Sequence, residues 1–143
     1  KEDQHWIGGL YYTRASHLFS FRNPELKIGI SAKAAVNWRL LWMLGEKPVY
    51  HVCSEQVVRD ARTDAVVFNA DFFRACDAGL VVEYKRELYF TDGVRENLPV
   101  GKIMYGGDIK ILRVSETEYS IRVGAWETGY RYFLLDTARW TCV

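Results

Sequence analysis

Cysteine is scarce in this sequence of 143 residues. The three cysteines, Cys53, Cys76 and Cys142, are far apart, and no two of them form a CxxC pair. An odd number of widely spaced cysteines does not match the framework of a small secreted disulfide protein or of a zinc site. We therefore expect a reducing, intracellular compartment, cytoplasmic or nuclear, and no bound metal.

Other features that would indicate a function are also missing. No apolar run is long enough to cross a membrane, and the net charge at pH 7 is only +1, so no overall field attracts nucleic acid or a lipid surface. The motifs GxGxxG, GxxxxGK[ST], GxSxG and HExxH, which mark common nucleotide-binding and hydrolytic sites, do not occur. These absences favour a protein that is not an enzyme, and we expect no cofactor.

Aromatic residues, in contrast, are abundant, at 15% of the sequence. Large rings suit a β-rich core, and they also serve as anchors where one protein binds another. The apolar content of 49% and the charged content of 26% are ordinary for a globular protein. A chain of this length can bury a sizeable core, and we expect a single domain over residues 1–143.

Residues 31–45, SAKAAVNWRLLWMLG, predict a buried central helix. Ser31 is a good N-cap, most of the following residues favour a helix, and Gly45 can adopt the left-handed conformation that ends one. Apolar residues lie on almost every side of this helix, which indicates burial. Two shorter helices are predicted, one over 54–62 and one that ends at Gly79.

The remaining segments predict strands. His5–Tyr12 reads as one strand interrupted at Gly8-Gly9, and apolar runs separated by turns follow residue 108. The predicted fold class is therefore α+β, a mostly antiparallel sheet around the buried helix with a C-terminal β-meander. The strands of that meander are predicted over Ile109–Val114, Tyr119–Val123, Tyr130–Leu135 and Arg139–Val143.

Two short patterns suggest chemistry. His51 and Cys53 stand at i and i+2 of a predicted strand, so they share one face, and a Cys–His pair can form an activated thiolate. A hydrogen-bonded core histidine beside an inert cysteine is the alternative. In the predicted meander, Arg122 and Arg131 have Tyr130 and Tyr132 nearby, and basic residues interleaved with aromatic ones are how some sheets stack single-stranded bases.

Residues 8–16, GGLYYTRAS, resemble the glycine–aromatic strand and small-residue turn of ADP-ribosyltransferases of the poly(ADP-ribose) polymerase type. In that family the aromatic residue stacks on nicotinamide, and a small hydroxyl residue supports the site. The resemblance implies that Tyr11 and Ser16 line a cleft together with a carboxylate, in an enzyme that uses NAD.

Three functional hypotheses follow. The first is a non-enzymatic intracellular binding module that recognises another protein, because catalytic motifs are missing and aromatic residues are in surplus. The second is an ADP-ribosyltransferase-like enzyme, and the third is a single-stranded nucleic-acid binder. The candidate ligand-binding residues are Tyr11, Ser16, Arg122 and Arg131.

Overall fold

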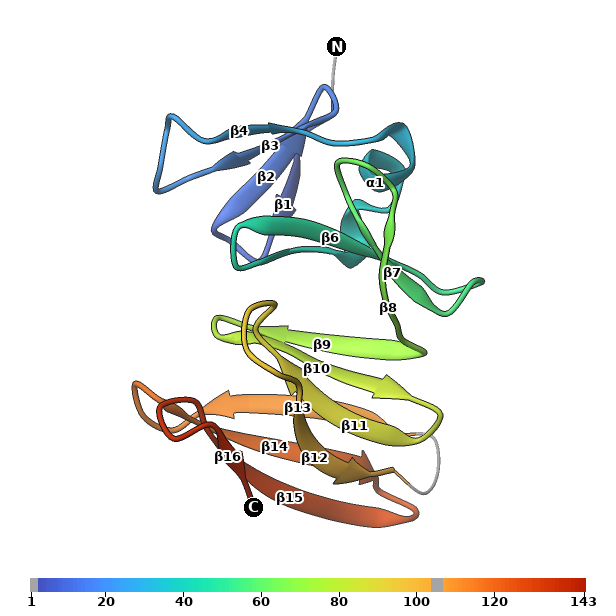
Figure 1. The fold of residues 1–143 in the computed structure, drawn as a ribbon, viewed down its shortest axis with the longest axis vertical. Coiled ribbons are helices and arrows are strands. Elements are labelled where there is room, and N and C mark those ends of the chain that lie inside the picture. The colour runs from blue at the N-terminus through green and yellow to red at the C-terminus, as the bar shows by residue number, and fades with distance from the viewer. Residues whose placement is uncertain (1–2, 104–106) are drawn as a thin grey trace. The chain divides into compact units, whose positions relative to one another are not determined.

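The structure is a computed structural model that describes residues 3–103 and 107–143. These residues form sixteen strands, one five-residue α-helix and one turn of 3-10 helix (Figure 1). The strands assemble four at a time into antiparallel sheets, in which each strand pairs with its neighbours in sequence. The prediction of an α+β fold is therefore wrong, and the described chain is almost entirely antiparallel sheet.

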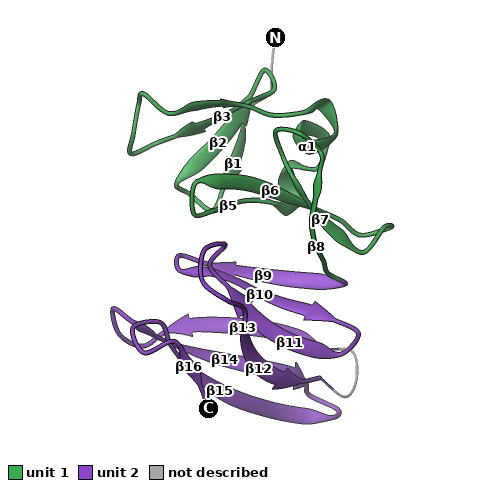
Figure 2. Ribbon diagram, in the orientation of Figure 1, with its two compact units in different colours: residues 1–70 green, residues 71–143 purple. Residues whose placement is uncertain are grey.

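The chain divides into two compact units, Lys1–Ala70 and Asp71–Val143 (Figure 2). Each unit contains two of the four sheets. The expectation of a single domain over residues 1–143 concerns how the two units act together, and it stays a prediction.

The first unit combines two four-stranded sheets with a short helical connection between them. Its buried side chains come from both sheets and from that connection, and Leu18, Ala34 and Tyr50 are fully buried among them. The first sheet consists of β1 (His5–Ile7), β2 (Tyr11–Arg14), β3 (His17–Ser20) and β4 (Lys27–Gly29). The second consists of β5 (Leu41–Leu44), β6 (Lys47–Val52), β7 (Val57–Asp60) and β8 (Val66–Asn69).

The predicted central helix over 31–45 is not present. Ser31 does cap a helix, because its hydroxyl accepts a hydrogen bond from the backbone N–H of Ala34 over 3.0 Å, but that helix, α1, covers only Ala32–Val36. A 3-10 turn, η1 (Trp38–Leu40), follows, and the chain then enters β5. Every residue of β5 pairs with a residue of β6, and this strand pairing outweighs the modest helix propensity of the segment.

The two shorter predicted helices are also strands. Residues 54–62 contain β7 (Val57–Asp60), in which Val58 and Asp60 are buried, whereas Val57 and Arg59 are only partly buried. The segment before Gly79 forms β9 (Phe72–Cys76). In both segments β-branched or aromatic residues find a neighbouring strand, and pairing then decides their conformation.

His5–Tyr12 forms two strands rather than the single strand that was predicted. Gly8 and Gly9 make the turn of the β1–β2 hairpin, with φ angles of 60° and 77°. A Cβ atom on Gly8 would lie only 2.4 Å from Cζ3 of Trp42, so this position needs glycine both for its backbone conformation and for its space.

The second unit packs two sheets around one shared core. Buried residues of both sheets meet in it, among them Phe90 from one sheet and Ile121 from the other. The first sheet consists of β9, β10 (Gly79–Tyr84), β11 (Glu87–Thr91) and β12 (Leu98–Lys102). The second consists of β13 (Asp108–Arg113), β14 (Glu118–Ala125), β15 (Gly129–Asp136) and β16 (Thr141–Cys142), which confirms the predicted C-terminal meander.

Within 3–103 and 107–143, no helix has the length and apolar character needed to cross a membrane.

Candidate functional site

The outward face of the first sheet carries a row of aromatic side chains. Trp6 lies directly opposite Tyr12, and Tyr12 directly opposite Phe19, in three neighbouring strands. Their ring centroids are 5.3 Å and 5.1 Å apart, and Phe21, just beyond β3, adds a fourth ring 5.9 Å from Trp6. We call Trp6, Tyr12, Phe19 and Phe21 the aromatic ladder.

Strand alternation explains why these rings point outward. Ile7, Thr13 and Leu18 stand next to ladder residues in the sequence, and all three are buried. Side chains alternate between the two faces of a strand, so the ladder residues point away from the core. Trp6 remains 50% exposed and Phe21 69% exposed, so a contiguous apolar surface faces solvent.

Two cations border the ladder near Phe19. Lys27 continues the row beyond Phe19 on β4, and the guanidinium carbon of Arg14 lies 5.8 Å from the centre of the Phe19 ring. Strands β1 to β4 contain no Asp or Glu. Among the residues that the structure describes, neither Arg14 nor Lys27 forms an ion pair, so both cations are available to a ligand.

The ring orientations limit what the ladder can bind. Tyr12 and Phe19 are nearly parallel, with 18° between their planes, so each covers one face of the other. Trp6 is tilted by 54° against Tyr12 and by 59° against Phe21. The ladder therefore presents a continuous apolar surface of ring edges and partly covered faces, and not a set of separate open faces.

The structure does not bring Tyr11 and Ser16 together. Tyr11 opens β2 and packs against the core of the first unit, on the opposite face of the sheet from Tyr12. Ser16 lies beyond the other end of β2, exposed in the tight turn before β3, with a φ of 59°. The cleft that the resemblance implied is not formed by this pair.

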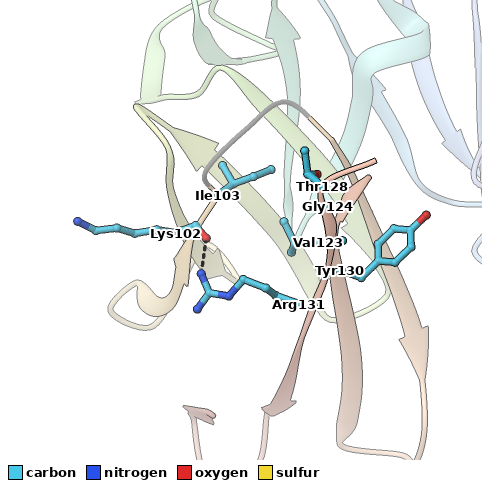
Figure 3. Close-up of a pocket in the computed structure, with 8 residues that line it drawn as sticks. Lys102, Ile103, Val123, Gly124, Thr128, Tyr130 and Arg131 are labelled. Atoms are coloured by element: carbon cyan, nitrogen blue, oxygen red, sulfur yellow. Dashed lines mark hydrogen bonds between the residues drawn. The ribbon is translucent and has the colours of Figure 1, made fainter. Parts of the chain in front are cut away.

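Arg122 and Arg131 lie on opposite faces of the C-terminal sheet. Arg122 is directly opposite Tyr132, whereas Arg131 is directly opposite the buried Val123. Figure 3 shows Tyr130 and Arg131 pointing to opposite sides of β15. The two arginines therefore do not contribute to one basic face.

Arg131 lines a pocket of about 210 Å³ at one end of this sheet (Figure 3). Its guanidinium donates a hydrogen bond of 3.0 Å to the backbone carbonyl of Lys102, which occupies part of its donor capacity. Among the described residues, the others that line the cavity are mainly apolar or small and bring no acid–base pair to it. They are Lys102, Ile103, Val123, Gly124, Thr128, Gly129 and Tyr130.

His51 and Cys53 share a face, as their spacing predicts. The sulfur of Cys53 lies 3.6 Å from Nδ1 of His51, and Nε2 of His51 lies 2.8 Å from the carbonyl oxygen of Ala70. His51 is buried, whereas Cys53 is exposed at the end of β6. The ring is thus held by the backbone, and the thiol remains open to solvent.

Asp60 serves a structural role in the first unit. Asp60 accepts hydrogen bonds from the backbone and side chain of Arg62, and the side-chain bond is the main reason why the pKa of Asp60 is lowered. Within the described residues, no group of three or more His, Cys, Asp or Glu is arranged to hold a metal ion.

The ladder was not predicted as a site from the sequence, although one part of the sequence pattern indicates it. Strict alternation over residues 16–21 already places Phe19 and Phe21 on one face. Trp6 and Tyr12 join them only because β1 and β2 form a hairpin, and its register depends on the turn at Gly8.

Comparisons with known protein families, with curated protein sequences and with solved structures find no match to this chain.

Proposed function

We propose that this chain is a non-enzymatic binding module that recognises a protein partner through the aromatic ladder. The observation that carries the proposal is the ladder itself: three neighbouring rings lie on the outward face of strands without a carboxylate, and the exposed ring of Phe21 follows directly after β3. Trp and Tyr are the residues on which binding energy concentrates in protein interfaces.

The charges around the ladder indicate the chemistry of the partner. Arg14 and Lys27 border the rings, and no strand of this sheet supplies a negative charge to balance them. A segment that carries Asp or Glu beside bulky apolar side chains satisfies both features. Its apolar groups cover the rings and its carboxylates pair with the two cations.

The ring arrangement favours a protein over single-stranded nucleic acid. Base stacking requires an open ring face, and Tyr12 and Phe19 cover one face of each other. The ADP-ribosyltransferase alternative receives no support from the geometry, because Tyr11 and Ser16 lie at opposite ends of their hairpin. We further propose that the module acts inside the cell, in the cytoplasm or nucleus, and its three free cysteines support this location.

Panning a random peptide library against the whole chain tests the proposal. We expect the enriched peptides to combine acidic residues with aromatic or branched apolar ones. Their affinity, measured by fluorescence polarisation, should fall at least about tenfold in Trp6→Ala, as for an interface anchor. Trp126→Ala is the matched control, because Trp126 is also an exposed tryptophan, at 84%, but lies in the other unit.

Two results would overturn the proposal. One is enrichment of peptides whose affinity does not change in Trp6→Ala. The other is tighter, salt-sensitive binding of a single-stranded oligonucleotide that Trp6→Ala weakens, which would assign the ladder to nucleic acid. Unchanged circular dichroism spectra of both variants would show that a lost affinity does not reflect a lost fold.

A further inference from the structure

The outward face of the C-terminal sheet holds two cations side by side. Lys110 on β13 lies directly opposite Arg122 on β14, and Arg122 lies directly opposite Tyr132 on β15. Side chains at such positions have Cβ atoms about 4.5–5.5 Å apart. These three residues, with Leu112 and Ser120 of the next row, line a hollow of about 180 Å³.

Like charges in directly opposite positions repel each other. In the part of the chain that the structure describes, neither Lys110 nor Arg122 has an ion-pair partner. Arg122 lies 4.5 Å from the centre of the Tyr130 ring, a contact that holds the guanidinium on this face and leaves its N–H groups able to donate. An anion between the two cations would remove the repulsion.

The acidic residues within two rows of the cations already have partners. Asp108 pairs with Arg74 over 2.8 Å, and this hydrogen bond is the main reason why the pKa of Asp108 is lowered, with Arg122 as a smaller contributor. Glu118 accepts a hydrogen bond of 3.1 Å from the hydroxyl of Ser115. Asp136 accepts hydrogen bonds from the backbone N–H groups of Ala138 and Arg139 in the next turn.

We propose that this hollow binds a phosphate monoester carried by a protein side chain. A monoester bears about −1.5 to −2 charges at pH 7, which matches two cations, whereas each phosphate of a nucleic-acid backbone bears one. Arg122 and Lys110 supply charge-assisted hydrogen bonds, and Ser120 and Tyr132 add hydroxyl groups to the lining.

The row next to the cations carries two leucines, and these explain the choice of a peptide. Leu112, Ser120 and Leu134 lie side by side there, and Leu112 is 61% exposed. Adjacent rows are two residues apart along a strand, so an extended peptide with an apolar side chain two residues from its phosphorylated residue can contact both rows. The site belongs to the second unit and does not depend on the aromatic ladder.

Isothermal titration calorimetry with the full chain tests the proposal. The probes are an eight-residue peptide with phosphoserine two residues from a leucine, its unphosphorylated form, and a single-stranded oligothymidylate. We expect the phosphopeptide to bind at least about tenfold more tightly than the unphosphorylated peptide, since charge-assisted bonds are lost without phosphate. Arg122→Gln and Lys110→Gln should each lower its affinity at least about fivefold.

Arg131→Gln is the matched control, because it removes the same charge from the opposite face of the same sheet. It should leave the affinity unchanged within about twofold. Lys110 is exposed, so we expect Lys110→Gln to fold, and this variant still tests the proposal if Arg122→Gln does not fold. Equal affinities for the two peptides, an equal loss in Arg131→Gln, or tighter binding of the oligothymidylate would each overturn the proposal.

Discussion

Ser31 and Asp64 are 33 residues apart in the chain, and the hydroxyl of Ser31 donates a hydrogen bond of 2.5 Å to Oδ1 of Asp64. The same hydroxyl oxygen accepts the N–H of Ala34, and the phenol of Tyr50 donates to the same carboxylate oxygen over 2.6 Å. One carboxylate therefore connects the start of α1 to β6 and to the turn between β7 and β8.

This network makes stability depend on pH in the acid range. The hydrogen bonds from Ser31 and then Tyr50 lower the pKa of Asp64 below its ordinary value. The folded state thus favours the charged form of Asp64. The stabilisation that this carboxylate provides is complete above about pH 4, and it is lost as the pH falls through the pKa of Asp64 in the folded state. We expect urea unfolding to show this decline, and Asp64→Asn to reduce both the decline and the stability near pH 7, by about 1 kcal/mol. An identical pH profile in Asp64→Asn would contradict this assignment.

Trp38 should contribute less to stability than a buried central helix would require. Its ring is only half-buried, stacked on His5 at 4.1 Å, with the Arg39 guanidinium carbon 4.4 Å from its centre. We expect Trp38→Ala to lower the free energy of unfolding by about 1–3 kcal/mol, below the ~3–5 kcal/mol typical of a fully buried tryptophan. Chemical denaturation measures this value, and a loss above about 4 kcal/mol would show that Trp38 belongs to the core.

Gly8 and Gly9 offer a matched pair of substitutions. Both have positive φ, but only at Gly8 would a new Cβ collide with the ring of Trp42, while at Gly9 nothing lies within 4 Å. Gly9→Ala should cost about 1 kcal/mol for backbone strain. Gly8→Ala should cost roughly 1–3 kcal/mol more, because Trp42 has to move. Thermal unfolding compares the two variants, and equal losses would mean that the contact with Trp42 does not restrict this turn.

The three cysteines should differ in reactivity. Burial raises the pKa of the Cys76 thiol and that of the Cys142 thiol, and both side chains are partly covered, whereas Cys53 is exposed. Since the thiolate is the reactive form, we expect iodoacetamide to modify Cys53 first at pH 7.5. Mass spectrometry of timed samples measures the order, with urea-unfolded protein as the control in which all three react alike. Faster labelling of Cys76 in the folded protein would refute the order.

Local sequence patterns predicted most strands correctly, but the helices that they predicted were wrong. The C-terminal meander was predictable because β14 alternates strictly, with Tyr119, Ile121 and Val123 all buried. The helix predicted over residues 31–45 was wrong because helix propensity is a weak preference. The pairing of β5 with β6 supplies hydrogen bonds that no local sequence pattern reveals. The cap at Ser31 was predictable because it depends on bonds within one turn.

The candidate sites also depend partly on the local sequence and partly on strand pairing. The sequence identifies both Arg122 and Arg131 as candidate ligand-binding residues. Only the register of β14 and β15, which pairs Arg122 with Tyr132 and Val123 with Arg131, shows that the two arginines lie on opposite faces of the sheet. The aromatic ladder likewise needs the pairing of three strands to bring its rings together.

The sequence by itself determined the abundance of strands, the free cysteines, the cap at Ser31 and the stock of aromatic and basic side chains, because these follow from composition and from contacts within a few residues. Only the tertiary structure decided that residues 31–45 turn from helix to strand, that four rings share one face in the first unit, and that Lys110 and Arg122 lie side by side in the second. Each of these depends on strand register, which is set by hydrogen bonds and packing between segments that the sequence does not show to be neighbours.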